Sequence, residues 1–303
     1  SQSYGFHKAS TQALKKIDGI CWAIRFMRVF ALNLSDSVGG AAKAACRIHQ
    51  AARAIGVDST LVVHRKNFND PHIIGPKNNF EILFDRFRSG IGVLVSRLIR
   101  TPKSDYHSPA IFPTSWSQKL NQSHADVVHL HWVQGEMMSV SDLGSIEKPL
   151  VWTLHDMWAF SGAEHYSETL RWKEGYSQSN RSQDEVGFDL NRWTWLRKQK
   201  AWKKPIQIVT PSYWLASCVQ GSVLMRDWPV EVIPNPIDVD QWIPIDKKLA
   251  REKLSLPQDV PLILFGAIGG ASDPRKGFDL LQKALQKLSG TIHGLELVVF
   301  GQT

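Results

Sequence analysis

The stretch that decides the fold class is MRVFALNLSDSVGGAAKAACRIHQAARAIGVDSTLVVH, residues 27–64. Its apolar run from Arg28 to Leu34 predicts a buried strand, and the alanine-rich run from Ala41 to Ile55 predicts a helix that packs closely on a sheet. Gly56 ends this helix, and Ser59 to His64 predicts a second strand. A strand, a helix and a second strand in this order are typical of parallel strands joined by a crossover helix.

The same alternation continues toward the C-terminus and predicts an α/β fold. We expect further strands at Ala125–Trp132, Pro149–Asp156, Pro205–Ser212 and from Val230, and helices at Glu81–Arg100, with a basic exposed side, and Asn191–Lys203. Residues 157–190 form a long polar and aromatic connection, and connections of this length are usually functional or disordered.

A proline-rich connector between Pro236 and Pro261 precedes a second unit, which restarts as strand, glycine-rich loop, helix and strand. We therefore predict an N-terminal domain at residues 27–236 and, at residues 237–303, a linker followed by the first part of a C-terminal domain. Residues 1–26 precede the first strand, and we interpret them as an extension outside the core. The chain stops just after an apolar strand, where ligand loops of an α/β sheet begin, so we expect the second domain to be truncated.

The composition is that of a folded protein, and its charge favours certain partners. Hydrophobic residues make up 43% of the 303 residues, which is enough for a folded core, and the net charge of +8 favours an anionic partner such as a nucleotide or a phospholipid headgroup. An ordinary basic surface accounts for the charge equally well. The basic residues are scattered without a recognisable motif, so we do not expect nucleic-acid binding.

Three cysteines, Cys21, Cys46 and Cys218, are far apart in the sequence and predict neither a disulfide framework nor a zinc site. They indicate a reducing compartment, so we expect a cytoplasmic protein. The sequence has no apolar run of about 18 residues, and its first 26 residues are mixed, so we do not expect a signal peptide.

Glycines follow two of the predicted strands. Gly39 and Gly40 lie between the first strand and its helix, and Gly266, Gly269 and Gly270 follow the first strand of the second unit. Glycine lets a ligand approach the backbone, and a helix N-terminus offers free N–H groups to an anion. The first loop lacks the GxGxxG spacing of a dinucleotide site, so an ordinary tight turn is the alternative.

Two cations follow the second glycine loop. Arg275 and Lys276, with Gly277, open the next predicted helix. Cations oppose the dipole at this end of a helix unless an anion lies between them and the helix. We therefore predict a bound diphosphate here rather than a merely solvated basic turn.

His155 and Asp156 lie at the carboxyl end of a predicted central strand, where open α/β sheets place ligands. This position predicts that His155 acts as an acid or base near neutral pH, or donates to a substrate hydroxyl or phosphate. A structural histidine bonded to a loop carbonyl is the alternative.

Two further patterns are compatible with metal binding. His129 and His131 lie on one face of a predicted strand, but a metal needs additional ligands, and strand histidines are commonly satisfied by neighbours. Asp238 and Asp240 match the DxD pattern of metal-dependent sugar transferases, but they lie in the proline-rich connector. We therefore predict no metal site.

Tryptophan is frequent, with 12 residues, many of them between Trp152 and Trp228. Aromatic faces suit sugar rings and protein cores alike. We interpret Trp193, Trp195 and Trp202, on one predicted helix, as packing residues.

Together these features resemble a family-4 retaining glycosyltransferase of the GT-B fold, over residues 27–303. The resemblance depends on the first strand with its two glycines, LHD at 154–156, VTPSYWLA at 209–216, VIPNPID at 232–238 and RKGFDLLQKAL at 275–285. The order and spacing of these pieces are more specific than any one of them. The HDMWAFSGAEHY run, residues 155–166, is similar to transferases of cell-surface polysaccharides, including the colanic-acid type.

The resemblance implies two Rossmann-like domains with a cleft between them. The acceptor would lie on the N-terminal domain and the nucleotide sugar on the C-terminal one. Transfer would retain the anomeric configuration and would need no metal or other cofactor. The aromatic residues after Asp156 would shape the acceptor side.

The resemblance also implies roles by position. Gly39 and Gly40 approach the donor phosphate or the acceptor, and Ser212 belongs to the substrate-binding residues. His155, with Asp156 beside it, contacts the transferred sugar.

In the second domain, Lys276 with Arg275 neutralises the departing diphosphate. The sequence departs from the family pattern here, because Ala267 follows Gly266 where many relatives have an arginine, and Arg275 is a candidate replacement. The family's acidic pair would lie beyond Thr303, so we expect this chain alone to be inactive. Nearer the N-terminus, the related branch often has cysteines where this sequence offers Ala163 and Glu164.

We therefore expect a hexosyltransferase-type enzyme of polysaccharide biosynthesis, with a nucleotide-sugar donor and a glycan or lipid-linked acceptor. The basic segment from Arg86 to Arg100 either contacts an anionic membrane at its inner face or forms a solvated helix face. Two other classes stay open: a non-catalytic remnant or carbohydrate-binding half-domain, and a nucleotide-sugar epimerase, whose paired acid and base groups are not recognisable here.

Overall fold

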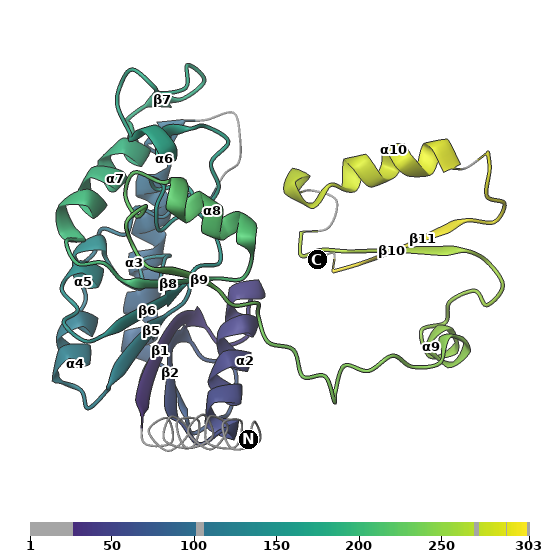
Figure 1. Ribbon diagram of the computed structural model, residues 1–303, viewed down its shortest axis with the longest axis horizontal. Coiled ribbons are helices and arrows are strands. Elements are labelled where there is room, and N and C mark those ends of the chain that lie inside the picture. Colours follow the sequence, from purple (N-terminus) through teal and green to yellow (C-terminus); the bar gives the residue numbers. More distant parts are fainter. Residues whose placement is uncertain (1–26, 101–105, 270–272, 289, 302–303) are drawn as a thin grey trace, which may run out of the picture. The chain divides into compact units, whose positions relative to one another are not determined.

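The computed structural model describes residues 27–100, 106–269, 273–288 and 290–301. The chain divides into two compact units, of which the first ends at Pro236 and the second begins at Ile237 (Figure 1). Each unit contains parallel strands joined by helical crossovers, so the α/β class predicted from the sequence is confirmed. The extension predicted at residues 1–26 lies outside the described residues.

The first unit is built on a seven-stranded sheet with the order β3-β2-β1-β5-β6-β8-β9, in which every neighbouring pair is parallel. Its strands are β1 (Arg28–Ser35), β2 (Asp58–Arg65), β3 (Ile73–Ile74), β5 (Val127–Leu130), β6 (Leu150–Thr153), β8 (Gln207–Thr210) and β9 (Val230–Val232). Its helices are α2 (Gly40–Ala54), α3 (Asn79–Ser96), α4 (Trp116–Gln122), α5 (Val140–Gly144), α6 (Arg171–Glu174), α7 (Leu190–Ala201) and α8 (Tyr213–Gly221).

The strand order reverses between β1 and β5. The chain leaves β1 toward β2 and β3 on one side, and the strands from β5 to β9 follow in sequence on the other side. Open α/β sheets bind ligands outside the carboxyl ends of their strands at such a reversal. We therefore expect the functional site at the carboxyl ends of these strands.

The core of the first unit contains large aromatic side chains. Trp152, Trp158 and Phe160 are fully buried, and the ring of Trp202 lies 5.5 Å from that of Trp152. Burial of Trp195 and Trp202 confirms that these residues pack in the core. The expectation that the aromatic residues after Asp156 shape an acceptor side is wrong for Trp158 and Phe160, because both have no exposed surface.

Helix α2 forms as its composition predicts, with Ala42, Ala44 and Ala45 buried against the sheet. Helix α3 differs from the prediction of a basic exposed side. Its buried residues are Arg88 and Gly92, whereas large apolar residues are exposed. Those exposed residues are Phe80, Ile82, Leu83, Phe84, Phe87, Val93 and Leu94.

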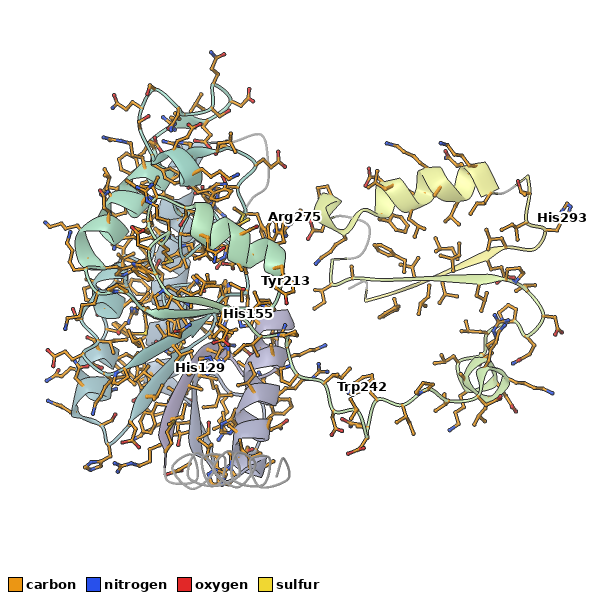
Figure 2. The ribbon with its side chains drawn as sticks, in the orientation of Figure 1. His129, His155, Tyr213, Trp242, Arg275 and His293 are labelled. Carbon is orange, nitrogen blue, oxygen red and sulfur yellow. The ribbon has the colours of Figure 1, made fainter. Side chains whose placement is uncertain are left out.

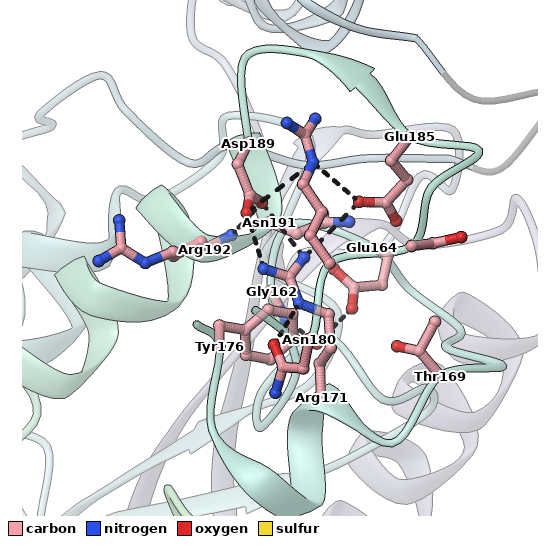
Figure 3. A network of polar contacts seen from close by, with 12 residues as sticks. Gly162, Glu164, Thr169, Arg171, Tyr176, Asn180, Glu185, Asp189, Asn191 and Arg192 are labelled. Atoms are coloured by element: carbon pink, nitrogen blue, oxygen red, sulfur yellow. Dashed lines mark hydrogen bonds and ion pairs between the residues drawn. The ribbon is translucent and has the colours of Figure 1, made fainter. Parts of the chain in front are cut away.

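Before α7 begins, residues 157–190 contain only the short elements α6 and β7 (Val186–Gly187), and a network of polar side chains connects the rest of the segment (Figure 3). The buried Arg171 donates to Asp189 at 2.7 Å and to Asn180 at 3.1 Å, and it lies 3.6 Å from Glu185. A short antiparallel pair, β4 (Ile99–Arg100) with β7, completes this region. In this region, side chains form hydrogen bonds with backbone N–H and C=O groups that would pair with other backbone groups in a strand or helix.

The second unit has the predicted order of strand, loop, helix and strand. Its elements are α9 (Lys247–Lys253), β10 (Leu262–Gly266), the 3-10 turn η2 (Pro274–Lys276), α10 (Phe278–Leu288) and β11 (Glu296–Phe300). The strands β10 and β11 are parallel, and the rings of Phe265 and Phe278 lie 5.0 Å apart, which packs α10 on the strands. Within the described ranges of both units, no helix combines the length and the apolar character needed to span a membrane.

Candidate functional site

His155 lies at the carboxyl edge of the large sheet, two residues after β6 ends (Figure 2). The backbone N–H of Leu154 still donates to the carbonyl of Val209 at 2.9 Å, so the sheet holds the chain up to the residue before His155. The ring of His155 is partly exposed, whereas Asp156 is buried. The sequence therefore predicts the position of this histidine at a strand end correctly.

The ring of His155 contacts that of His131, with 3.2 Å between the His155 Nε2 and His131 Nδ1 atoms. Burial lowers the pKa of His155 to about 4, although the neighbouring Asp156 acts in the opposite direction. Burial also lowers the pKa of His131 far below its ordinary value. Both rings are neutral at pH 7, so His155 offers a hydrogen bond rather than an imidazolium proton.

The strand histidines do not form a metal site. The His129 ring shares a hydrogen bond with the Thr153 hydroxyl at 2.8 Å, so a neighbour satisfies it as predicted. Among the residues that the structure describes, no group of His, Cys, Asp or Glu side chains could hold a metal ion. Asp238 accepts from the backbone N–H groups of Asp240 and Gln241, which makes the DVD segment an ordinary turn.

Asp156 is the centre of a buried hydrogen-bond cluster. Its carboxylate accepts from the Trp132 indole N–H at 2.8 Å and the Trp158 backbone N–H at 3.0 Å, and it lies 2.6 Å from the His165 Nδ1 atom. Burial alone would raise the pKa of Asp156, but His165 and these donors lower it, so the carboxylate stays ionised. His165 in turn lies 2.8 Å from the Ser108 hydroxyl.

This Ser108–His165–Asp156 row has the residue order of a hydrolase triad, yet the Ser108 side chain is buried, with 1% exposed. A substrate cannot reach a hydroxyl at that depth. The hydrogen bonds among these three residues therefore hold the segment that follows β6 in place, and this segment includes His155.

The glycine turn after β1 leaves backbone accessible. Gly39 has φ 91°, a conformation that favours glycine, and no atom lies within 4 Å of the place a side chain would occupy at Gly39 or Gly40. No side chain caps the N-terminus of α2. The N–H groups of its first turn can therefore face a ligand.

Ser212 caps helix α8, because its hydroxyl accepts from the Leu215 backbone N–H at 3.3 Å. The cap also presents Tyr213, which is 83% exposed, and Trp214 just after strand β8, the neighbour of β6 (Figure 2). Neither aromatic residue was predicted as a site residue from the sequence, although their position directly after a strand and its helix cap was the available signal.

In the second unit, the predicted phosphate residues lie before α10 rather than in it. Arg275 and Lys276 belong to the 3-10 turn η2, and Gly277, with φ 71°, separates them from the helix. Arg275 donates to both carboxylate oxygens of Asp273 at 2.9 Å, so its charge is partly balanced. Lys276 is exposed, and its charge adds to the effect of Arg275 in lowering the pKa of Asp273. Gly269 has φ 81°, while Gly270 lies outside the described residues.

A family comparison covers most of these positions. Residues 38–241 match the model of Glycosyltransferase Family 4, which is more than half of the chain. The chain belongs to glycosyltransferase family 4. The matched range of this family-4 glycosyltransferase includes the glycine turn, His155, Asp156 and Ser212. Membership of this family agrees with the GT-B type of fold, built from Rossmann-like units, that the sequence predicts.

Solved structures similar to this family-4 glycosyltransferase are distant in sequence. HepE from Anabaena, in complex with UDP and glucose, has 13% identity and a TM-score of 0.44, and the match covers 90% of this chain and 69% of that one. A glycosyltransferase from Rickettsia africae has 11% identity and a TM-score of 0.44 over 90% and 68% of the two chains. LpCGTa in complex with UDP has 12% identity and a TM-score of 0.41 over 91% and 70%. No curated protein matches the sequence.

Proposed function

We propose that this family-4 glycosyltransferase transfers a hexosyl group from a nucleotide-sugar donor to a glycan or lipid-linked acceptor in polysaccharide biosynthesis, with retention of configuration. The observation that carries the proposal is the neutral, partly exposed His155 at the carboxyl edge of the sheet, inside the range that matches the family. Open α/β sheets bind their ligands at this edge.

In this proposal His155 contacts a hydroxyl of the transferred sugar. A neutral imidazole that shares Nε2 with His131 has Nδ1 left for one hydrogen bond to a ligand. Asp156 does not contact substrate; it holds the chain beside His155 through Trp132 and His165. Gly39 and Gly40 supply exposed backbone to a phosphate or to the acceptor.

The donor diphosphate binds the second unit in this proposal. The difficult step of transfer is the charge that develops on the departing diphosphate, and preorganised cations and N–H groups stabilise such charge. Lys276 supplies an exposed ammonium group, and Arg275 supplies a guanidinium that Asp273 orients. These two cations take the place of a metal, so we propose a metal-independent reaction.

Ser212 acts in the proposed site through the helix that it caps. The cap places Tyr213 and Trp214 at the carboxyl edge with their rings exposed. Sugar rings have apolar C–H faces that stack on aromatic rings. We propose that these two residues contact sugar, in place of the buried aromatic residues after Asp156.

We further propose a cytoplasmic protein that contacts an anionic membrane through α3, where lipid-linked acceptors lie. Phe80, Leu83, Phe84 and Phe87 expose apolar surface on this helix, and Arg86 is exposed beside them. Aromatic and aliphatic side chains flanked by arginine are typical of helices that lie in a membrane interface.

A donor screen tests the proposed function. The full-length protein is incubated with a panel of nucleotide sugars and a glycan acceptor mixture, and nucleotide release and product anomeric configuration are measured. We expect one donor to be consumed, with its configuration retained, in the presence of a chelator. Inverted product, dependence on a divalent metal, or consumption of no donor would contradict the respective part of the proposal.

A further inference from the structure

A cavity of about 480 Å³ lies in the first unit at the carboxyl ends of β1 and β2, beneath helix α3. Val38, one of its lining residues, directly precedes the glycine turn at Gly39. The cavity therefore adjoins the proposed site without including His155. Its volume lies within the range of pockets that hold small ligands.

Hydrogen bonds across separate loops fix the walls of this cavity. The buried carboxylate of Asp36 accepts from the backbone N–H groups of Asn67 and Phe68, each at 2.8 Å. On the opposite wall, the Ser89 hydroxyl of α3 donates to the carbonyl of Gly135 at 3.0 Å. The cavity is thus held in shape by contacts between residues far apart in the sequence.

A histidine and a carboxylate on the cavity wall have a defined arrangement. The Trp116 indole N–H donates to the His64 Nε2 atom at 3.0 Å, so this ring carries its proton on Nδ1. That Nδ1 atom lies 3.3 Å from an oxygen of Asp85. Within the described part of the chain, the second oxygen of Asp85 has no hydrogen-bond partner, so it can accept from a ligand.

Three cations line the same cavity, against the single carboxylate of Asp85. The Lys66 ammonium group donates to the carbonyls of Asp70 and Ile73, at 3.0 and 2.6 Å. Arg65 and Arg86 are exposed, and within the described ranges neither guanidinium group makes a hydrogen bond or ion pair. Two guanidinium groups that lack a partner among the described residues favour an anionic ligand at this cavity, since their planar N–H groups match phosphate and carboxylate.

We propose that this cavity binds the acceptor as an anionic sugar, with Arg65 and Arg86 on its phosphate or carboxylate group and Asp85 on a sugar hydroxyl. The inference rests on the proposed function, in which the donor diphosphate binds the second unit. It adds the chemical class of the acceptor and the residues that select it. A neutral sugar would leave both guanidinium groups without a partner and would bind more weakly.

Direct binding tests the cavity without requiring turnover. Titrations of the full chain with glucose 6-phosphate, glucuronate and glucose are followed by calorimetry. We expect both anionic sugars to bind at least about tenfold more tightly than glucose, because hydrogen bonds to charged groups are stronger than those between neutral groups. A parallel titration uses a short-chain lipid linked through phosphate to glucose. Tighter binding of this ligand than of glucose 6-phosphate indicates a lipid-linked acceptor, and weaker binding indicates a free anionic sugar.

The Arg65→Ala and Arg86→Ala variants are each expected to lose about tenfold in affinity for the anionic sugars, and Arg65→Lys is expected to recover part of it. Arg226→Ala is the matched control, because Arg226 is an exposed arginine beside Asp227 and outside the cavity. Equal affinity of all variants, or glucose binding as tightly as the anionic sugars, would overturn the proposal. Donor consumption without acceptor, measured on the same samples, tests the proposed function separately from this cavity.

Discussion

The Nδ1 atom of His131 lies 3.2 Å from the Nε2 atom of His155, which joins the residues that follow β5 and β6 at the carboxyl edge of the sheet. Both rings are neutral at pH 7, since burial holds the pKa of His155 at about 4 and that of His131 well below its usual value. The pair therefore presents one ring nitrogen of His155 to a ligand. This geometry suits a hydrogen bond to a sugar hydroxyl better than a proton-transfer step.

Asp156 is predicted to stabilise the chain that carries His155. Asp156→Ala leaves the Trp132 indole N–H and His165 without their buried acceptor, so we expect the free energy of unfolding to fall by about 2–4 kcal/mol. Urea unfolding followed by circular dichroism measures this change. Ser108→Ala removes the far end of the row and a long hydrogen bond from the Gly135 backbone N–H, and it should cost about 1 kcal/mol. An Asp156→Ala midpoint equal to that of the unmodified protein would refute the structural role.

Stability is predicted to decrease as the pH falls from about 7 to about 4.5. Burial lowers the pKa of His49, His64, His129 and His155 to about 4, whereas unfolded histidine titrates near 6.5. Between these values the unfolded state binds protons that the folded state does not, so unfolding becomes easier. Each histidine contributes at most about 1.4 kcal/mol per pH unit.

Urea unfolding at a series of pH values measures this slope. His129→Asn should flatten it, because one buried titrating group is removed, while His124→Asn should leave it unchanged, because His124 is exposed. A free energy of unfolding that is constant between about pH 7 and pH 5 would contradict the assignment of these rings as neutral.

The exposed face of α3 is predicted to bind anionic vesicles. Phe84→Ser with Phe87→Ser removes two exposed rings from this face, and we expect vesicle binding to fall at least about tenfold. Flotation with and without anionic lipid measures the bound fraction. Phe68→Ser is the matched control, because Phe68 is exposed but not on α3. If the protein does not float with anionic vesicles, or if the double variant floats equally well, this face has another role.

Local sequence patterns predicted most of the regular structure. The predicted strand at Arg28–Leu34 differs from the observed one by one residue at its C-terminal end, and the predicted helix at Ala41–Ile55 differs by one residue at each end. The agreement is close because buried strands and alanine-rich helices are determined by nearby residues. The short helices α4 and α5 were not predicted. Their five to seven residues carry too little periodicity, and tertiary contacts decide them.

The site was only partly predictable for a similar physical reason. A strand that ends in His155 indicates an edge position, and the structure shows it there. The hydrogen-bond partners of Asp156, however, are Trp132 and His165, which lie 24 and 9 positions away in the sequence. A local sequence pattern cannot predict contacts between residues so far apart. Helix α3 shows the same limit, because its periodicity reveals an apolar face but does not tell which face the domain buries.

Lys276 is predicted to bind the donor diphosphate. Lys276→Ala removes an exposed ammonium group that can pair with a phosphate, so we expect nucleotide-sugar affinity to fall about tenfold. Lys287→Ala, at an exposed position in the last turn of α10, is the control and should bind as the unmodified protein does. Calorimetric titration with the donor found in the screen measures both. Unchanged affinity of Lys276→Ala would exclude the assignment.

The most direct test of the account is the rate of sugar transfer by the full-length His155→Ala variant, measured with several nucleotide-sugar donors. Because His155 is partly exposed, we expect the variant to fold normally by thermal unfolding. Its transfer rate should fall about 100-fold, the usual effect of removing a hydrogen bond that stabilises a transition state. His124→Ala, at an exposed histidine outside the site, should transfer at the normal rate. A folded His155→Ala protein that transfers sugar at an undiminished rate with every donor would contradict the proposed role of this edge of the sheet.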